Sequence, residues 1–168
     1  MDLFLVRHAI AVEQDAEEYP NDDRPLTDAG VRKMTEAARG IARMIPDLDA
    51  IFTSPLIRAK HTAEIVARAF GCEKRMEVTG LLAPGGWANS VIAHLAARQD
   101  EDRVMLVGHE PDMGLLAGAL VGAEHSVAEF KKGSVCCIRV DGVPGETRGV
   151  IRWHLSAKWL KRMGESPD

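Results

Sequence analysis

Three places in the sequence put side chains capable of chemistry directly after an apolar run. Arg7 and His8 follow "DLFLV", Ser54 follows "DAIFT", and His109 follows "RVMLVG"; Arg58 comes one helical turn after Ser54. A guanidinium donates a planar fork of hydrogen bonds that matches phosphoryl oxygens, and a neutral imidazole is a nucleophile. Together these residue types indicate phosphate chemistry, provided that the fold brings them to one place.

The elements that must position these residues alternate along the chain. Short apolar runs typical of buried strands are separated by segments in which apolar residues recur at helical spacing. The expected strands are residues 2–6, 49–54, 74–78 and 103–107. One helix is expected between Thr27 and Pro46 and a second from Ser54 to Gly71. Two more helices are expected at residues 87–97 and 112–121, and a loop at 83–86.

Two of these helices have clear start signals. Thr27 is placed as an N-cap ahead of the periodic residues that begin at Val31. In "SPLIRAKHTAEIVARAFG" we expect Ser54 to be the N-cap, Pro55 to be the first helical residue and Gly71 to end the helix.

The last third of the chain has a different pattern. "SVCCIRVDG" and "GVIRWHL" flank a turn rich in Gly and Pro, which predicts an antiparallel hairpin. The whole pattern predicts an α/β fold: a three-layer sandwich with a mostly parallel central sheet and an antiparallel C-terminal strand. No repeat or linker interrupts it, so we expect one domain over residues 1–168.

In sheets of this kind, ligands bind beyond the carboxyl ends of the strands. The groups at Arg7-His8, Ser54 and His109 follow three such ends, so we expect them to face one pocket. The N-terminus of the helix expected near Pro55 adds free N–H groups that favour an anion. Nearby cations disfavour a protonated imidazole, so we expect His8 to stay neutral and nucleophilic.

The composition disfavours several other classes of protein. The chain has 168 residues and a formal net charge of −4, whereas sequence-independent nucleic-acid binding needs a basic stripe. No apolar stretch approaches the ~20 residues of a membrane span, and a strand that starts at Asp2 leaves no room for a secretory signal. We therefore expect a cytoplasmic protein with no nucleic-acid or membrane partner.

Metal and redox roles are also disfavoured. Cys72, Cys136 and Cys137 form no C-x-x-C pair and fit reduced, buried thiols. The six histidines are dispersed without an H-E-x-x-H motif, so we expect no metal and no cofactor. A monomer is compatible with the sequence. The histidines outside the motifs are expected to be structural or solvated: His61, His94, His125 and His154.

Four motifs in order resemble the histidine phosphatase superfamily, which has the phosphoglycerate-mutase-like fold. They are "LVRHAIA", "LTDAG", "TSPLIRAKHTAEIV" and "VGHEPD". The chain has Ala9 where most members have Gly, which removes no reacting group. Its short length and the form S-P-x-x-R-A-x-x-T-A are most similar to the SixA branch, the bacterial phosphohistidine phosphatases.

The resemblance implies a role for each residue of the motifs. His8 would attack phosphorus and become transiently phosphorylated, and water would then hydrolyse the phosphohistidine. Arg7, Arg58 and an imidazolium at His109 would hold the phosphoryl oxygens, with Ser54 among the phosphate-binding residues. No metal is required, because side-chain cations take its place.

The general acid of the superfamily has no clear counterpart. Many members place a Glu after the third strand, where this chain has Gly80 or Leu81, and Glu77 is expected within the strand. The weaker candidates are Asp15, Glu110 and Asp112. An alcohol leaves poorly without a proton, whereas a protonated imidazole leaves readily, so the pattern favours phosphohistidine.

The segment between Val78 and Arg103 is short and mostly one helix, so the site is expected to lack a lid and to admit a phosphohistidine on another protein. Lys131 and Lys132 either line its rim or keep a strand edge soluble. Two alternatives stay open: a phosphatase of small phosphomonoesters or polyphosphate, and a non-catalytic protein that binds phosphorylated partners.

Overall fold

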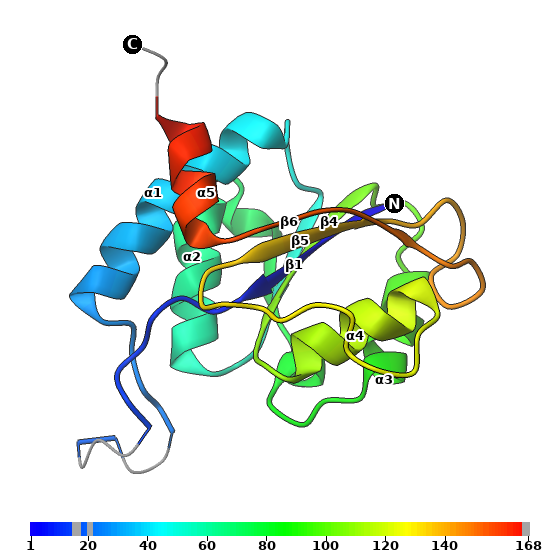
Figure 1. Cartoon of the computed structure of the whole chain (residues 1–168), viewed down its shortest axis with the longest axis horizontal. Coiled ribbons are helices and arrows are strands. Elements are labelled where there is room, and N and C mark those ends of the chain that lie inside the picture. Colours follow the sequence, from blue (N-terminus) through cyan, green and yellow to red (C-terminus); the bar gives the residue numbers. More distant parts are fainter. Residues whose placement is uncertain (15–17, 20–21, 166–168) are drawn as a thin grey trace.

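The computed structural model describes residues 1–14, 18–19 and 22–165 (Figure 1). Within these ranges six strands form one sheet in the order β3-β2-β4-β1-β5-β6. The strands are β1 (Asp2–Arg7), β2 (Ala50–Thr53), β3 (Met76–Val78), β4 (Arg103–Gly108), β5 (Val135–Arg139) and β6 (Val150–Leu155).

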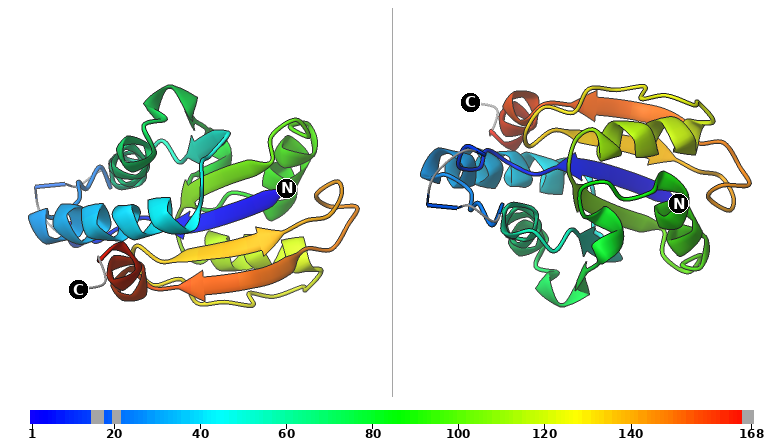
Figure 2. Two further views of the ribbon diagram at one scale, coloured as in Figure 1. Left: turned by 90° about the horizontal axis from the view of Figure 1, so that it is seen from above. Right: turned by 90° about the horizontal axis from the view of Figure 1, so that it is seen from below.

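The sheet is mixed in the way that the sequence predicts. The neighbouring strands β3, β2, β4 and β1 are parallel. β5 pairs antiparallel with β1, and β6 pairs antiparallel with β5, as the arrowheads in Figure 2 show. The hairpin at the C-terminal end is therefore confirmed, and β5 is the strand that reverses direction.

Five α-helices cover the two faces of the sheet in the described part of the chain. They are α1 (Asp28–Met44), α2 (Ile57–Phe70), α3 (Ala88–Ala96), α4 (Asp112–Val121) and α5 (Ala157–Gly164), with short 3-10 turns η1 (Glu73–Arg75) and η2 (Gly80–Leu82). α1, α2 and α5 pack on one face, and α3 and α4 pack on the other (Figures 1 and 2).

The alternation of side chains along β1 shows why both faces need helices. Phe4 and Val6 join the cluster under α1 and α2, whereas Leu3 and Leu5 join the cluster under α3 and α4. Because successive residues of a strand point to opposite faces, a strand that is apolar at every position must be covered on both sides. The three-layer sandwich is confirmed.

The helix α5 is absent from the sequence-based prediction. It is eight residues long, and Leu160 is its one fully buried apolar residue. Trp159 and Met163 are about half exposed. Its apolar residues recur at helical spacing, but the helix has only about two turns and directly follows a strand, so the pattern is short; its position is determined by packing against α1.

The predicted N-cap of α1 is confirmed, and that of α2 is wrong. The Thr27 hydroxyl accepts a hydrogen bond from the Gly30 N–H at 3.0 Å. α2 begins at Ile57, after an N-cap at Leu56 that makes no side-chain bond, so Pro55 precedes the helix. The Ser54 hydroxyl accepts from the Leu56 N–H at 3.3 Å, outside the helix.

A glycine lets the loop after β1 pass close to the start of α1. A Cβ on Gly30 would lie 2.0 Å from the carbonyl oxygen of Ile10. That oxygen also accepts the Thr27 N–H at 3.0 Å. The motif "LTDAG" therefore anchors the loop that carries His8, since Thr27 starts the helix and Gly30 makes room for the loop.

We expect Gly30→Ala to destabilise the protein by about 1–3 kcal/mol, because the new methyl group clashes with backbone that has little freedom to move. Urea denaturation measures the change. The matched control is Gly80→Ala, since a Cβ at Gly80 has no atom within 4 Å. Equal stability of the two variants would contradict the role given to Gly30.

Candidate active site

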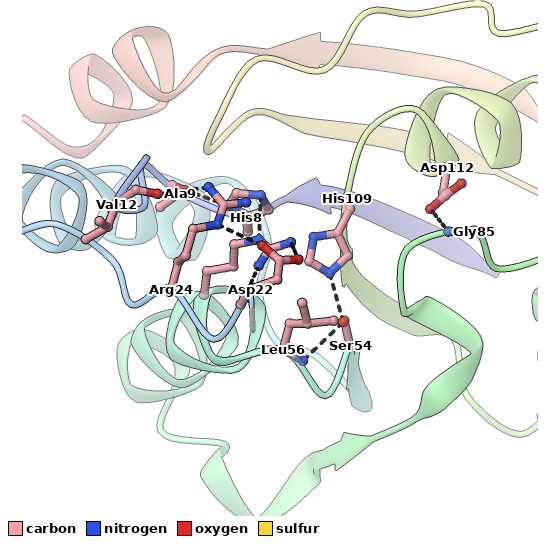
Figure 3. A network of polar contacts seen from close by, with 11 residues as sticks. His8, Ala9, Val12, Asp22, Arg24, Ser54, Leu56, Gly85, His109 and Asp112 are labelled. Carbon is pink, nitrogen blue, oxygen red and sulfur yellow. Dashed lines mark hydrogen bonds and ion pairs between the residues drawn. The ribbon is translucent and has the colours of Figure 1, made fainter. Parts of the chain in front are cut away.

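The register of three neighbouring strands brings the predicted residues to one edge of the sheet. The His8 N–H donates to the Gly108 carbonyl at 3.0 Å, so the ends of β1 and β4 are joined. The Ser54 N–H donates to the Val107 carbonyl, also at 3.0 Å, which joins β2 to β4. His8, Ser54 and His109 therefore lie together, as Figure 3 shows.

The imidazole of His8 is held in one orientation. Its Nδ1 lies 2.7 Å from the carbonyl oxygen of Ala9. A carbonyl only accepts, so the ring proton is on Nδ1 and the lone pair is on Nε2. Arg58 Nε donates to that Nε2 at 3.3 Å. The Ala9 backbone is fixed in turn by its N–H bond to the Thr62 hydroxyl at 3.0 Å.

His8 is only 6% exposed, and its environment opposes protonation. Burial lowers the pKa of His8 to about 3; the bond to Ala9 works against the shift, and His109, Arg58 and Arg7 add to it. The neutral state expected from the neighbouring cations is therefore found, but desolvation is the larger cause.

Arg58 is buried in α2, and all of its nitrogens have partners. Besides His8, it donates to the backbone oxygen of Asp22 at 2.9 Å and to the carboxylate of Asp22 at 3.0 Å. Arg24 donates to the other carboxylate oxygen at 2.8 Å. Asp22 thus joins two guanidiniums next to His8. Figure 3 shows Asp22, Arg24 and His8 together.

Asp22 and Arg24 were missed by the sequence analysis. Burial raises the pKa of the Asp22 carboxyl, but the hydrogen bonds from Arg24 and Arg58 outweigh it and hold the pKa below its usual value. Arg24 is 9% exposed and also donates to the Val12 carbonyl at 2.8 Å. The only signal was an arginine in front of "PLTDAG", in a loop that otherwise reads as solvated.

His109 faces His8, with ring centroids 5.2 Å apart. Its Nε2 lies 2.8 Å from the Ser54 hydroxyl oxygen, which also accepts a hydrogen bond from the Leu56 N–H. The Nδ1 atom of His109 is buried without a protein partner in the described part of the chain.

The charge of His109 depends on its burial. Burial lowers the pKa of His109 to about 4, and Arg58 lowers it further while Asp22 acts in the opposite direction. Without a bound anion the ring is therefore neutral at pH 7. The imidazolium expected from the resemblance is the state with a phosphoryl group in contact, and desolvation of this residue is not visible in the sequence.

Arg7 is held by a chain of bonds from the loop before β5. Its Nη1 donates to the Phe130 carbonyl at 2.6 Å, and the Phe130 N–H donates to the Glu110 carboxylate at 2.5 Å. Arg7 Nε is buried without a protein partner among the described residues. Arg7 Nε is a donor that needs an acceptor, and so is His109 Nδ1 when it carries the ring proton; an oxyanion supplies several acceptor atoms.

The described candidates for a general acid have other partners. Glu77 is paired with Arg98 at 2.9 Å, and the hydrogen bond from Arg98 lowers the pKa of its carboxyl. Glu110 accepts from backbone N–H groups. Asp112 accepts from the Gly85 N–H at 2.9 Å, apart from the cluster around His8 (Figure 3). Asp15 lies outside the described residues.

The remaining predicted positions lie elsewhere. Gly80 and Leu81 belong to η2, and Glu77 is in β3, as expected. His61 is on α2, His94 stacks edge-on against Phe52, His125 is exposed, and His154 packs against Phe130.

The described residues contain no group of three or more His, Cys, Asp or Glu side chains that could hold a metal ion. The three cysteines are free and buried. Among the helices that the structure describes, none has the length and apolar character to cross a bilayer.

The chain is similar to known histidine phosphatases. The family model described as "Histidine phosphatase superfamily (branch 1)" matches residues 3–81. An uncharacterised protein of Picosynechococcus sp. is 32% identical over 166 residues, which cover 95% of this chain and 99% of the relative. The phosphohistidine phosphatase SixA homolog of Haemophilus influenzae is 29% identical over 157 residues, 87% of this chain and 92% of the relative.

The fold agrees as well. A solved structure of the protein histidine phosphatase SixA complexed with tungstate superimposes with a TM-score of 0.83 at 26% identity, covering 95% of this chain and 99% of that one. The chain belongs to the histidine phosphatase superfamily. Within it, the chain is similar to SixA proteins over nearly their whole length.

The low pKa values of His8 and His109 predict how the protein responds to acid. In 15N NMR spectra both rings should stay neutral between about pH 5 and pH 7, whereas an ordinary histidine titrates near 6.5. The unfolded chain takes up these protons near pH 6.5, so stability is full above that pH and falls as pH drops toward 4. At pH 5, each of the two buried imidazoles should lower the free energy of unfolding by about 2 kcal/mol relative to pH 7.

Urea denaturation at pH 7 and pH 5 measures this loss, and His125→Ala serves as the control because His125 is exposed. A midpoint near 6.5 for either ring in the folded protein would show that burial does not control its charge.

Proposed function

We propose that the protein is a phosphatase that works through a covalent phosphohistidine on His8. The lone pair of His8 Nε2 attacks phosphorus, the P–N bond forms, and the bond from phosphorus to the leaving group breaks. Water then attacks the same phosphorus, the P–N bond to His8 breaks, and inorganic phosphate leaves. This is a two-step covalent route.

The other residues stabilise the phosphoryl group in this proposal. Arg7 and Arg58 donate to its oxygens, and His109 donates from Nδ1. Ser54 acts as a positioning residue, because its hydroxyl bonds His109 Nε2 and determines where the ring proton lies. Phosphoryl transfer depends mostly on positioning and on stabilising negative charge, which suits a cluster of fixed cations.

One observation carries the proposal: the unprotonated Nε2 of His8 accepts a hydrogen bond from the buried Arg58, beside the buried Arg24 and His109 and the partly buried Arg7. A residue that served only to bind phosphate would be a donor at that position. Support also comes from the SixA structure, which holds tungstate, a tetrahedral oxyanion like phosphate.

The proposed substrate is phosphohistidine on a protein. Support comes from the described carboxyl candidates, each of which is engaged by other donors, since a P–N bond to a protonated imidazole breaks without help from a strong acid. A second source of support is the short segment after β3, where η2 and α3 leave no lid-sized insertion. The name of the Haemophilus relative points to the same substrate.

We further propose that residues 1–168 work as one metal-independent domain in the cytoplasm. The basic side chains at the site take the place that a divalent cation has in nucleotide enzymes. Three free cysteines, two of them adjacent, fit a reducing compartment.

A substrate panel tests the choice of substrate. We expect kcat/KM for a protein carrying phosphohistidine to exceed that for a phosphoserine peptide by about 10²-fold or more, because the alkoxide of serine needs a proton donor. Turnover of p-nitrophenyl phosphate should be measurable, since the proposed donors bind the oxygens of any phosphoryl group.

Two other outcomes of the same panel would contradict the proposal. Preference for a small phosphomonoester or for polyphosphate would favour the small-molecule phosphatase. Tight binding of all substrates without turnover would favour the non-catalytic binder.

A further inference from the structure

A groove lies next to the candidate active site, between α1, α5 and the loop that precedes β5. Its volume is about 550 Å³, within the range of ligand-binding sites. We refer to it as the lysine groove, because five of the seven lysines of the chain line it: Lys33, Lys131, Lys132, Lys158 and Lys161.

The positive charge of the lysine groove is almost uncompensated. Glu36 is the one acidic side chain among its described lining residues, and it is paired with Lys161 at 3.1 Å. The other four lysines form no ion pair within the described part of the chain. The whole chain carries a net charge of −4, so positive charge is concentrated here against the overall balance. Such a concentration attracts an acidic partner.

The floor of the groove is apolar and adjoins the nucleophile. Ala9, Ile10 and Met34 line it, and Ala9 directly follows His8. The N–H of Gly133 donates to the backbone oxygens of Arg7 and His8 at 3.1 Å each. The loop that carries two of the lysines is therefore bonded to the loop that carries the nucleophile, so a molecule in the groove lies beside the active site.

The start of α5 adds to the attraction for anions. Ser156 and Ala157 line the groove, and the Ser156 hydroxyl makes no capping bond. The N–H groups of the first helical turn are consequently not satisfied by this side chain, and they favour a carboxylate. Figure 1 shows α5 beside α1, with its first turn near the loop that precedes β5.

We propose that the lysine groove docks an acidic, amphipathic segment of the phosphorylated protein substrate; this inference rests on the proposed function. Carboxylates of the segment meet the lysines, and its apolar side chains cover Ile10 and Ala157, which are partly exposed. Docking holds the phosphohistidine close to His8 and raises its effective concentration there. The groove does not contact the phosphoryl group, so it favours acidic protein substrates and leaves small substrates unaffected.

Two synthetic peptides test the proposal. Each carries one phosphohistidine and a few Leu residues; in one the flanking polar residues are Asp and Glu, and in the other they are Gln. The wild type should have a kcat/KM about tenfold higher for the acidic peptide. Lys158→Glu should remove most of this preference, and Lys33→Glu combined with Lys158→Glu should abolish it.

The matched control is Lys74→Glu, because Lys74 is exposed in η1 and lines no part of the groove. It changes the net charge as much as Lys158→Glu and should keep the preference. Turnover of the Gln peptide and of p-nitrophenyl phosphate should be the same in all variants, since these substrates do not use the groove.

Fluorescence anisotropy measures binding of the unphosphorylated acidic peptide, and so tests docking in the lysine groove independently of turnover. The proposal is overturned if the two peptides bind equally, if Lys74→Glu weakens binding as much as Lys158→Glu, or if polyphosphate or a peptide with Ser in place of Leu competes equally well. If neither phosphopeptide is hydrolysed faster than p-nitrophenyl phosphate, the proposed substrate is wrong, and the binding data still decide the groove.

Discussion

His8→Ala should lower kcat by about 10⁴-fold or more, because it removes the atom that forms the covalent bond to phosphorus. The thiols of Cys136 and Cys137 are buried, and burial raises their pKa values to about 12, so they stay protonated. Stopped assays with p-nitrophenyl phosphate measure the loss, and the melting temperature shows whether the fold is retained.

His125→Ala is the control for that variant, since His125 is exposed and should be dispensable. If His8→Ala retained a tenth or more of the activity with an intact fold, another residue would have to be the nucleophile.

Arg58→Ala should lower kcat/KM by about 10²- to 10³-fold, the usual effect of deleting one donor to a developing negative charge. The guanidinium contacts His8 Nε2, so it lies beside the position that the phosphoryl group must take while the P–N bond forms. Orthovanadate, which mimics phosphate, should inhibit the variant far less than the wild type. Inhibition constants from steady-state kinetics test both effects together.

Arg68→Ala is the matched control for Arg58→Ala, because Arg68 is an exposed arginine on the same helix. Unchanged vanadate inhibition in Arg58→Ala would mean that Arg58 serves only to hold Asp22.

The sequence predicted the position of the site because backbone pairing determines it. Arg7-His8, Ser54 and His109 each follow a strand, and the carboxyl ends of parallel neighbours meet at one edge. Their proximity also depends on the strand order, in which β4 lies between β1 and β2, and the sequence did not predict that order. The anchoring of the loop by Thr27 follows in the same way from a local capping rule.

The partners of Arg58 could not be predicted in this way. Asp22 reaches Arg58 from a loop, with a positive φ of 60°, and loop conformation has no periodic signal in the sequence. The start of α2 was misplaced for a related reason: Ser54 has the right type for an N-cap, but its hydroxyl binds His109. Tertiary contacts of this kind override local propensity.

The protonation of the two histidines depends on burial, which a motif does not reveal. The charge of neighbouring arginines correctly predicts a neutral His8, but the same argument should have been applied to His109. In both residues desolvation is the largest cause of the lowered pKa. An imidazolium at His109 would require the negative charge of a bound phosphoryl group to offset that cost.

Trapping the phosphoenzyme tests most directly whether His8 carries the phosphoryl group during turnover. The protein is mixed with excess 32P-labelled phosphoramidate in EDTA and quenched in alkali within milliseconds, and the label is mapped by peptide mass spectrometry. We expect alkali-stable, acid-labile phosphate on His8, formed in the presence of EDTA and absent from His8→Ala. Label on a serine or cysteine, or label that requires a divalent cation, would contradict it.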